Sequence, residues 1–228
     1  MARVIYANQK LENPIHGLIF DMDGVLFDTE RDSLPNIIRI GKEMGVEIPL
    51  EFVIENMGRN QAEESILMRE LLGSGFDTDT FWDRYWTDRN RRYDACGMPV
   101  KEGAIKLLEA ALEKQCPCVV ASSSPCSEVW KSLDRANLRR YFVDVVGGDL
   151  FEHSKPAPDI FLAGAKLLGV SPQRCMVIED SLNGLKAARA AGTLVAFVKD
   201  IPSYPESELR RYCDFSFDSA ADISEMLS

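Results

Sequence analysis

Short apolar runs alternate with amphipathic stretches along most of the chain, and this alternation predicts its elements. The run from Leu18 to Phe20 is continuous in its apolar character, which is typical of a strand buried on both faces of a sheet. Further strands are expected at residues 118–121, 143–146, 175–178 and 194–198, and helices at residues 101–114, after Pro125, at 158–168 and at 182–191. Strands that alternate with helices give a parallel sheet with right-handed crossovers. We therefore expect an α/β fold with a Rossmann-like, doubly wound core.

The segment from residue 30 to residue 97 has helical periodicity throughout and no strand pattern. Apolar positions recur first from Leu34 to Met44, with Asp32 or Ser33 expected as the helix cap and Pro35 in the first turn. A second helix is expected around residues 66–72, and a third carries a stripe formed by Phe81, Trp82, Tyr85, Trp86, Arg89 and Tyr93. Such a stripe is typical of a helix core. We expect residues 30–97 to form an inserted helical cap, and residues 1–29 and 98–228 to form the sheet-containing core.

Composition and charge narrow the function classes. The 228 residues carry a net charge of −10, which disfavours nucleic acids and acidic membrane surfaces because both require clustered Lys and Arg. No run approaches the roughly 18 apolar residues of a membrane span, and no apolar leader follows Met1. Six scattered cysteines are consistent with reduced thiols. We expect a monomeric cytoplasmic enzyme that acts on a small molecule.

Two carboxylates follow the first buried strand. Asp21 and Asp23 are two residues apart, so in extended chain their side chains project the same way at the strand's carboxyl end, where open α/β sheets bind ligands. Adjacent anions repel unless one holds a proton or a cation lies between them, and oxygen ligands of this kind suit Mg²⁺. An exposed Asp-rich turn after a strand is the alternative.

Other strand ends carry further polar groups. Ser122 and Ser123 precede a helix, where a hydroxyl and turn N–H groups can bind a phosphate oxygen or simply cap the helix. Lys155 lies in a loop between prolines, SKPAP, as a solvated lysine or as a cation for an anionic site. Glu179 and Asp180 end another strand, and two more acids there favour a cation, with Asp180 as its ligand and Glu179 as an auxiliary one. Asp180 as a plain helix cap is the alternative.

These residues, in this order, resemble the four motifs of the haloacid dehalogenase superfamily, in its phosphatase and phosphomutase branch. The stretch DMDGVLFDTE resembles the first motif, Ser122 the second, the K-P-x-P run at Lys155 the third, and VIEDSLNG the fourth. The resemblance implies Asp21 as a nucleophile that forms an aspartyl-phosphate and Asp23 as the acid/base that also offers its carbonyl to Mg²⁺. It implies Lys155, Ser122 and Ser123 as groups that hold the phosphoryl oxygens, and a small phosphorylated metabolite as the substrate.

Related activities remain as alternatives. Dehalogenases typically lack the second aspartate, and phosphonoacetaldehyde hydrolases use a cap lysine, where this chain has Lys42 alone. The nearer rival is a β-phosphoglucomutase-type phosphomutase, whose family carries a His where Ser33 stands and basic residues where Met57 and Gln61 stand. We therefore expect a phosphatase, with a non-catalytic regulatory protein as the remaining alternative. Gly58, Arg59 and Gln61 are expected as substrate contacts from the cap.

Overall fold

A seven-stranded sheet forms the centre of the computed structural model, which describes residues 4–7, 14–56, 59, 61–201 and 204–227. The strand order is β1-β7-β6-β5-β2-β3-β4. All neighbouring pairs are parallel except β1 and β7, which are antiparallel at the sheet edge. The strands are β1 (Val4–Ala7), β2 (Gly17–Phe20), β3 (Cys118–Ser122), β4 (Phe142–Gly147), β5 (Cys175–Glu179), β6 (Leu194–Val198) and β7 (Phe215–Phe217).

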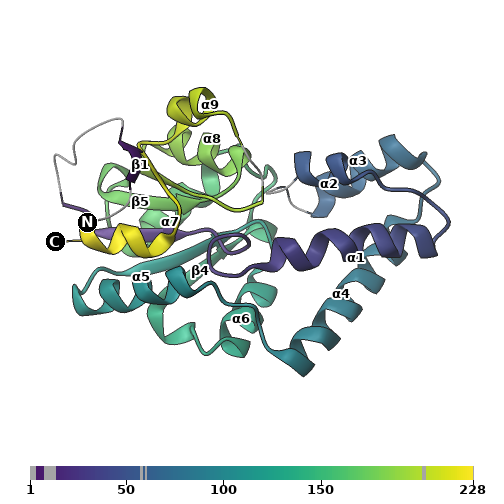
Figure 1. Cartoon of the computed structure of the whole chain (residues 1–228), viewed down its shortest axis with the longest axis horizontal. Helices are drawn as coiled ribbons and strands as arrows, with labels where there is room; N and C mark the ends of the chain where they lie inside the picture. The colour runs from purple at the N-terminus through teal and green to yellow at the C-terminus, as the bar shows by residue number, and fades with distance from the viewer. Residues whose placement is uncertain (1–3, 8–13, 57–58, 60, 202–203, 228) are drawn as a thin grey trace.

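Helices cover both faces of the sheet, as the continuous apolar strands require. Leu18 and Phe20 of β2 pack into one core cluster, whereas Ile19 packs into a second cluster on the opposite face. The first cluster includes residues of α5 (Glu102–Glu113) and α6 (Cys126–Arg135), and the second includes residues of α7 (Asp159–Leu168), α8 (Leu182–Ala191) and α9 (Glu206–Tyr212). Figure 1 shows α5 and α6 on one side of the sheet and α8 and α9 on the other. This arrangement is the expected doubly wound core.

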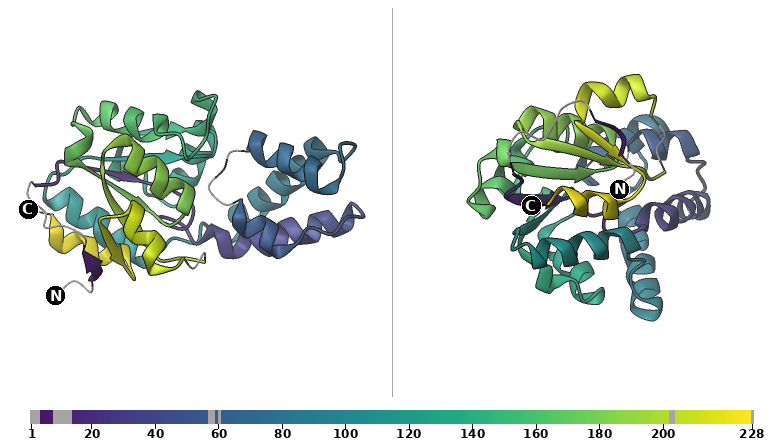
Figure 2. Two further views of the ribbon diagram at one scale, coloured as in Figure 1. Left: turned by 90° about the horizontal axis from the view of Figure 1, so that it is seen from above. Right: turned by 60° about the vertical axis from the view of Figure 1, so that its left-hand side comes forward.

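Four further helices lie between β2 and α5 in the sequence. They are α1 (Thr29–Glu43), α2 (Leu50–Glu55), α3 (Gln61–Leu72) and α4 (Thr78–Cys96), and they bury a separate apolar cluster centred on Ile40, Met68 and Phe81. Figures 1 and 2 show this helical region beyond one end of the sheet and not on either of its faces. The two connecting stretches run together, because Asp28 N donates to Pro99 O over 2.8 Å and Phe27 bridges to Val100.

The strands and long helices follow the sequence pattern closely, but one boundary differs. Helix α1 begins at Thr29, with Asp28 at the N-cap position, instead of beginning at Asp32 or Ser33. The reason is the paired connection, which ends at Asp28 and lets the helix start at once. Pro35 therefore lies inside the helix, where it is exposed, so that water can bond the backbone carbonyl that the proline leaves unpaired.

Several short elements carry no signal strong enough to predict them. Helices α2 and α9 span only about two turns each, and β1 and β7 span three or four residues each. Four short 3₁₀ helices complete the described chain, at Arg139–Tyr141, Gly148–Leu150, Pro172–Arg174 and Ala220–Met226. Within the described ranges, none of the helices is both long enough and apolar enough to cross a bilayer.

Candidate active site

The carboxyl end of β2 places Asp21 and Asp23 at the wall of one cavity. This cavity has a volume of about 120 Å³ and lies between the sheet and the helical region. Asp21 is 8% exposed, and its backbone N–H continues the pairing with β5 by donating to Ile178 O. Gly24, with a φ of 78°, turns the chain away, and a Cβ at this position would lie only 2.1 Å from Asp180 Oδ2. The turn therefore requires glycine, both for its conformation and for the close approach of Asp180.

Lys155 bridges two carboxylates below the cavity. Its Nζ donates to Asp21 Oδ1 over 2.5 Å and to Glu179 Oε1 over 2.7 Å, and the residue is 2% exposed. Burial raises the pKa of Asp21, and the Lys155 ammonium partly offsets this effect. Burial alone would lower the pKa of Lys155, but the two carboxylates hold it above its usual value. Lys155 is thus a fixed cation and not a solvated loop lysine.

Glu179 uses both of its oxygens within the protein. Oε1 accepts from Lys155, and Oε2 accepts from the backbone N–H groups of Asp180 and Ser181, each over 2.8 Å, and from Ser181 Oγ over 3.0 Å. Gly184 at the start of α8 lies against this carboxylate, since a Cβ there would be 1.7 Å from Glu179 Oε1. The geometry therefore favours Glu179 as the residue that positions Lys155, and direct metal ligation by Glu179 stays a prediction.

Three acidic side chains come together where a cation can be held. Oxygens of Asp21, Glu179 and Asp180 all lie within 4.8 Å of one another. Asp21 and Asp180 line the cavity, together with Asp23. A cluster of carboxylate oxygens is the donor set that Mg²⁺ prefers, so the chemistry of these residues fits that ion.

The end of β3 supplies hydrogen-bonding groups on the other side of the cavity. Ser122 is buried, its Oγ accepts from the backbone N–H of Ser124 over 3.1 Å, and both residues line the cavity with Ser123. Helix α6 begins shortly afterwards at Cys126. The structure therefore brings Ser122 and Ser123 to the same cavity as Asp21, as the sequence predicts.

The aromatic stripe on α4 packs in the apolar cluster of the helical region, as the sequence predicts, and part of it also borders the cavity. Phe81, Trp82 and Tyr85 are buried members of this cluster, and Trp82, Tyr85 and Trp86 also line the cavity. Helical spacing shows that these rings share a face, but the helix is long enough for that face to pack on α1 and also to border a cavity.

Arg89 of the same stripe, which the sequence analysis assigned to the core, lies in the cavity wall beside Asp23. It is 6% exposed, and its guanidinium lies 3.7 Å from Asp23 Oδ1 and over the rings of Trp86 and Tyr93. Burial would lower the pKa of Arg89, but Tyr85 and Asp23 raise it, so the side chain is a permanent cation in the cavity wall. The signal available in the sequence was that Arg89 falls at the same helical spacing as the aromatic residues of the stripe.

The other predicted substrate contacts are only partly described. Arg59 and Gln61 line the cavity, whereas Gly58 lies outside the described residues, as does Met57. Arg59 forms an ion pair with Glu63, which also accepts a hydrogen bond from Ser154 Oγ, next to Lys155. The helical region thus contacts the loop that carries Lys155.

Two more residues of the site had no sequence signal. Thr29, the first residue of α1, donates from Oγ1 to Asp23 Oδ1. Glu64 of α3 lines the cavity, and burial raises the pKa of its carboxyl to about 8. Both depend on which helix face meets the sheet, and periodicity alone does not give that.

Comparison with known proteins adds independent findings. The family model described as haloacid dehalogenase-like hydrolase matches residues 15–192. The chain is 36% identical over 193 residues to the Arabidopsis thaliana protein named SUPPRESSOR OF QUENCHING 1, chloroplastic, a match that covers 81% of this chain but only 18% of that protein. It is 30% identical to the phosphorylated carbohydrates phosphatase of Thermotoga maritima, with 78% of this chain and 82% of the relative covered.

Another relative and one solved structure are of similar size to this chain. Fructose-1-phosphate phosphatase YqaB of Escherichia coli is 30% identical, with 77% of this chain and 92% of the relative covered. A crystal structure titled putative β-phosphoglucomutase from Thermotoga maritima has a TM-score of 0.72 and 27% identity, and covers 92% of this chain and 97% of its own.

Proposed function

Because the chain belongs to the haloacid dehalogenase-like hydrolase family, we propose that it is a Mg²⁺-dependent phosphatase that hydrolyses a small phosphomonoester through an aspartyl-phosphate. The observation that carries this proposal is the buried Asp21–Lys155–Glu179 arrangement, which fixes one carboxylate beside a cation at the wall of a cavity. Relatives named as phosphatases of phosphorylated carbohydrates support a small phosphorylated metabolite as the substrate.

In the first step, a carboxylate oxygen of Asp21 attacks phosphorus and the bond from phosphorus to the ester oxygen breaks. Asp23 gives its proton to that ester oxygen, so the alcohol leaves neutral. Thr29 Oγ1 and the Arg89 guanidinium are both close to Asp23 Oδ1 and keep this carboxyl group facing the cavity. The product of the step is a phosphoryl group covalently bound to Asp21.

In the second step, water attacks the phosphorus of the aspartyl-phosphate and Asp23 accepts a proton from it. The bond between phosphorus and the Asp21 oxygen breaks, which restores the carboxylate and releases inorganic phosphate. Lys155, Ser122 and Ser123 bind the phosphoryl oxygens in both steps, so that charge is stabilised by groups already in place. Glu179 holds Lys155 in position.

The carboxylates of Asp21 and Asp180 and the backbone carbonyl of Asp23 would hold Mg²⁺. Bound there, the ion neutralises negative charge on the phosphoryl group and on the aspartates. Without a cation, Asp21, Asp23 and Asp180 would repel both each other and an anionic substrate.

We propose residues 30–97 as a cap that selects the substrate. The support is geometric, since Arg59, Gln61 and Arg89 all reach the cavity from the helical region. A monomeric state and a cytoplasmic location stay predictions, and the name of one relative places that protein in the chloroplast.

A phosphomutase is the second candidate, because solved structures titled β-phosphoglucomutase share this fold. The sequence argument against it was that Met57 and Gln61 offer no cation for a second phosphate. Arg59 and Arg89 in the cavity wall weaken that argument. Ser33, however, is hydrogen-bonded to the Tyr85 hydroxyl at 2.8 Å and supplies no titratable group there.

Phosphate release from a panel of phosphomonoesters that includes sugar phosphates tests the proposal. We expect activity that EDTA removes and Mg²⁺ restores, and full activity in the chelator would contradict the metal-dependent site. Supplying β-glucose 1-phosphate with catalytic glucose 1,6-bisphosphate separates the two candidates. Glucose 6-phosphate appearing faster than inorganic phosphate would favour the mutase.

A further inference from the structure

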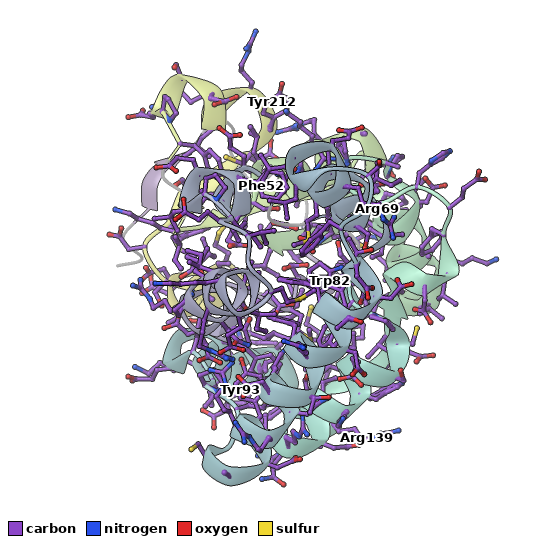
Figure 3. All side chains as sticks on the ribbon, turned by 90° about the vertical axis from the view of Figure 1, so that its right-hand side faces the viewer. Phe52, Arg69, Trp82, Tyr93, Arg139 and Tyr212 are labelled. Atoms are coloured by element: carbon purple, nitrogen blue, oxygen red, sulfur yellow. The ribbon has the colours of Figure 1, made fainter. Side chains whose placement is uncertain are left out.

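One wall of the cavity is built from three aromatic rings. Trp82, Tyr85 and Trp86 lie on successive positions of one α4 face, and Figure 3 labels Trp82 on this helix. Neighbouring rings pack edge to face, with centroids 5.4 Å apart for Trp82 and Tyr85 and 5.1 Å apart for Tyr85 and Trp86. The rings therefore hold one another in place. Trp82 and Tyr85 are each 5% exposed, so Trp86 is the ring that is most open to the cavity.

The polar atoms of all three rings are already engaged. Trp82 Nε1 donates to Ser65 Oγ over 2.9 Å, and Trp86 Nε1 donates to Gln61 Oε1 over 2.8 Å. The Tyr85 hydroxyl is 2.8 Å from Ser33 Oγ. What the wall offers to a ligand is thus mainly ring carbon, and Ile37 and Val53 add further apolar surface to the same cavity.

The helix geometry sets how far this wall lies from the reacting atoms. Arg89 is 3.7 Å from Asp23, and Tyr85 and Trp86 lie one helical turn before it. At about 1.5 Å per residue, positions 82–86 lie roughly 4 to 10 Å along the helix axis from Arg89. A group that contacts the wall is therefore attached to the ester oxygen through only a few bonds.

Polar side chains border the wall where the edge of a bound ring would lie. Gln61 and Glu64 both line the cavity from α3. The Gln61 carbonyl is fixed by Trp86, and its amide group remains as a donor. Glu64 is half-buried and has an oxygen pair that can accept, or when protonated donate, a hydrogen bond.

From these observations we propose that the leaving group carries a planar ring with polar edges, as in a nucleoside 5′-phosphate, which packs against Trp86, the most exposed ring of this wall. A polyhydroxylated sugar would gain less from Trp86 than a planar ring does, because Trp86 Nε1 is engaged with Gln61 and the rest of its ring is carbon. This inference rests on the proposed phosphatase function and names the substrate class for it.

The test compares substrates that share a leaving alcohol but differ in the ring. Uridine 5′-phosphate and ribose 5-phosphate both release a ribose C5 hydroxyl, and only the first carries a base. Because stacking of a base on an aromatic side chain is worth about 1–3 kcal/mol, we expect kcat/KM to be about tenfold or more higher for uridine 5′-phosphate. Benzyl phosphate against cyclohexylmethyl phosphate separates planarity from bulk, and the planar member should again be favoured.

Matched tryptophan variants show whether the wall is responsible. Trp86→Leu should bring the ratio of kcat/KM for the two ribose compounds close to one. Trp130→Leu should preserve the ratio, because Trp130 lies on α6 under Arg139, away from the cavity. A wild-type ratio below about threefold, or a ratio that Trp86→Leu leaves unchanged, would overturn the inference.

Binding separates this inference from the proposed function. In the Asp21→Asn variant with Mg²⁺, calorimetry should show at least about tenfold tighter binding of uridine 5′-phosphate than of ribose 5-phosphate. If no phosphomonoester is hydrolysed by the wild type, the phosphatase proposal fails, and the binding difference still supports the ring site. Equal affinities for the two compounds would overturn the ring site even if phosphate is released.

Discussion

Replacing Glu179 with glutamine separates the two roles that this residue can have, positioning Lys155 or binding the metal. The Glu179 and Lys155 side chains are each 1% exposed, and Glu179 accepts from Lys155, from two backbone N–H groups and from Ser181 Oγ. In Glu179→Gln, the amide oxygen can keep the hydrogen bonds from the backbone N–H groups. The amide –NH₂ then points toward the Lys155 ammonium, so two donors face each other.

The expected loss of stability follows from the buried pair. Breaking a buried ion pair by removing one partner costs about 3–5 kcal/mol, and we expect the lower end, about 3 kcal/mol, because Asp21 still pairs with Lys155. Urea unfolding of the two proteins in the same buffer measures this difference. Glu102→Gln is the matched control, since its partner Lys106 is on the exposed face of α5, and it should leave the unfolding free energy unchanged.

Activity distinguishes the two roles of Glu179. We expect kcat to fall while the Mg²⁺ concentration for half-maximal activity rises less than about tenfold, whereas Asp180→Asn should raise that concentration about a hundredfold. The positioning role would be refuted if Glu179→Gln unfolds like the wild type and needs as much additional Mg²⁺ as Asp180→Asn.

Three further predictions follow from the site. Asp21→Asn should abolish turnover and leave the fold intact, because it relieves anionic repulsion at nearly constant volume; phosphate release near the wild-type rate would exclude Asp21 as nucleophile. Arg89→Met should lower kcat/KM by about tenfold or more with little change in the urea midpoint, since the Asp23 side chain is 25% exposed and stays hydrated, and methionine keeps the contact with Trp86 and Tyr93; a destabilised variant with full activity would instead make Arg89 structural. Glu64 has a folded-state pKa of about 8 against about 4.3 when unfolded, so the native state binds its proton more tightly and stability should fall as pH rises from about 4 to 8. Glu64→Gln should remove part of this loss of stability. Its urea midpoint should therefore exceed that of the wild type by an amount that grows toward pH 8. A difference that shrinks as the pH rises would contradict the burial of this carboxyl.

The sheet and the residues at its strand ends were predictable from local pattern. Continuous apolar runs give buried strands, and the polar residue after each run must lie at the carboxyl end, so Asp21, Ser122 and Asp180 could be placed together from the sequence alone. The resemblance to the haloacid dehalogenase superfamily added their roles, and the family match agrees with it.

What the sequence did not provide is the set of contacts across elements. Strand order is a long-range property, so the pairing of β2 with β5, which brings Glu179 to Lys155 beside Asp21, had no local signal. The same limit applies to α4, where periodicity groups Trp82 with Arg89 but does not show that a cavity borders them. A residue whose partner lies on a different helix or strand can be assigned to the site only once the structure shows how the two elements pack.

The central place of β2 has a consequence for how the chain folds during synthesis. Strand β2 leaves the ribosome before both of its sheet neighbours, because β3 and β5 follow the whole helical region in the sequence. The contact between Lys155 and Asp21 joins positions 134 residues apart. The helices α1–α4 can form from nearby contacts while both edges of β2 still lack their partners, and closing such long loops is slow because of its entropic cost. The strand that leads to Asp21 is therefore made well before its partners can secure it, and a nascent chain that stops before β5 exposes an apolar strand edge to chaperones and proteases.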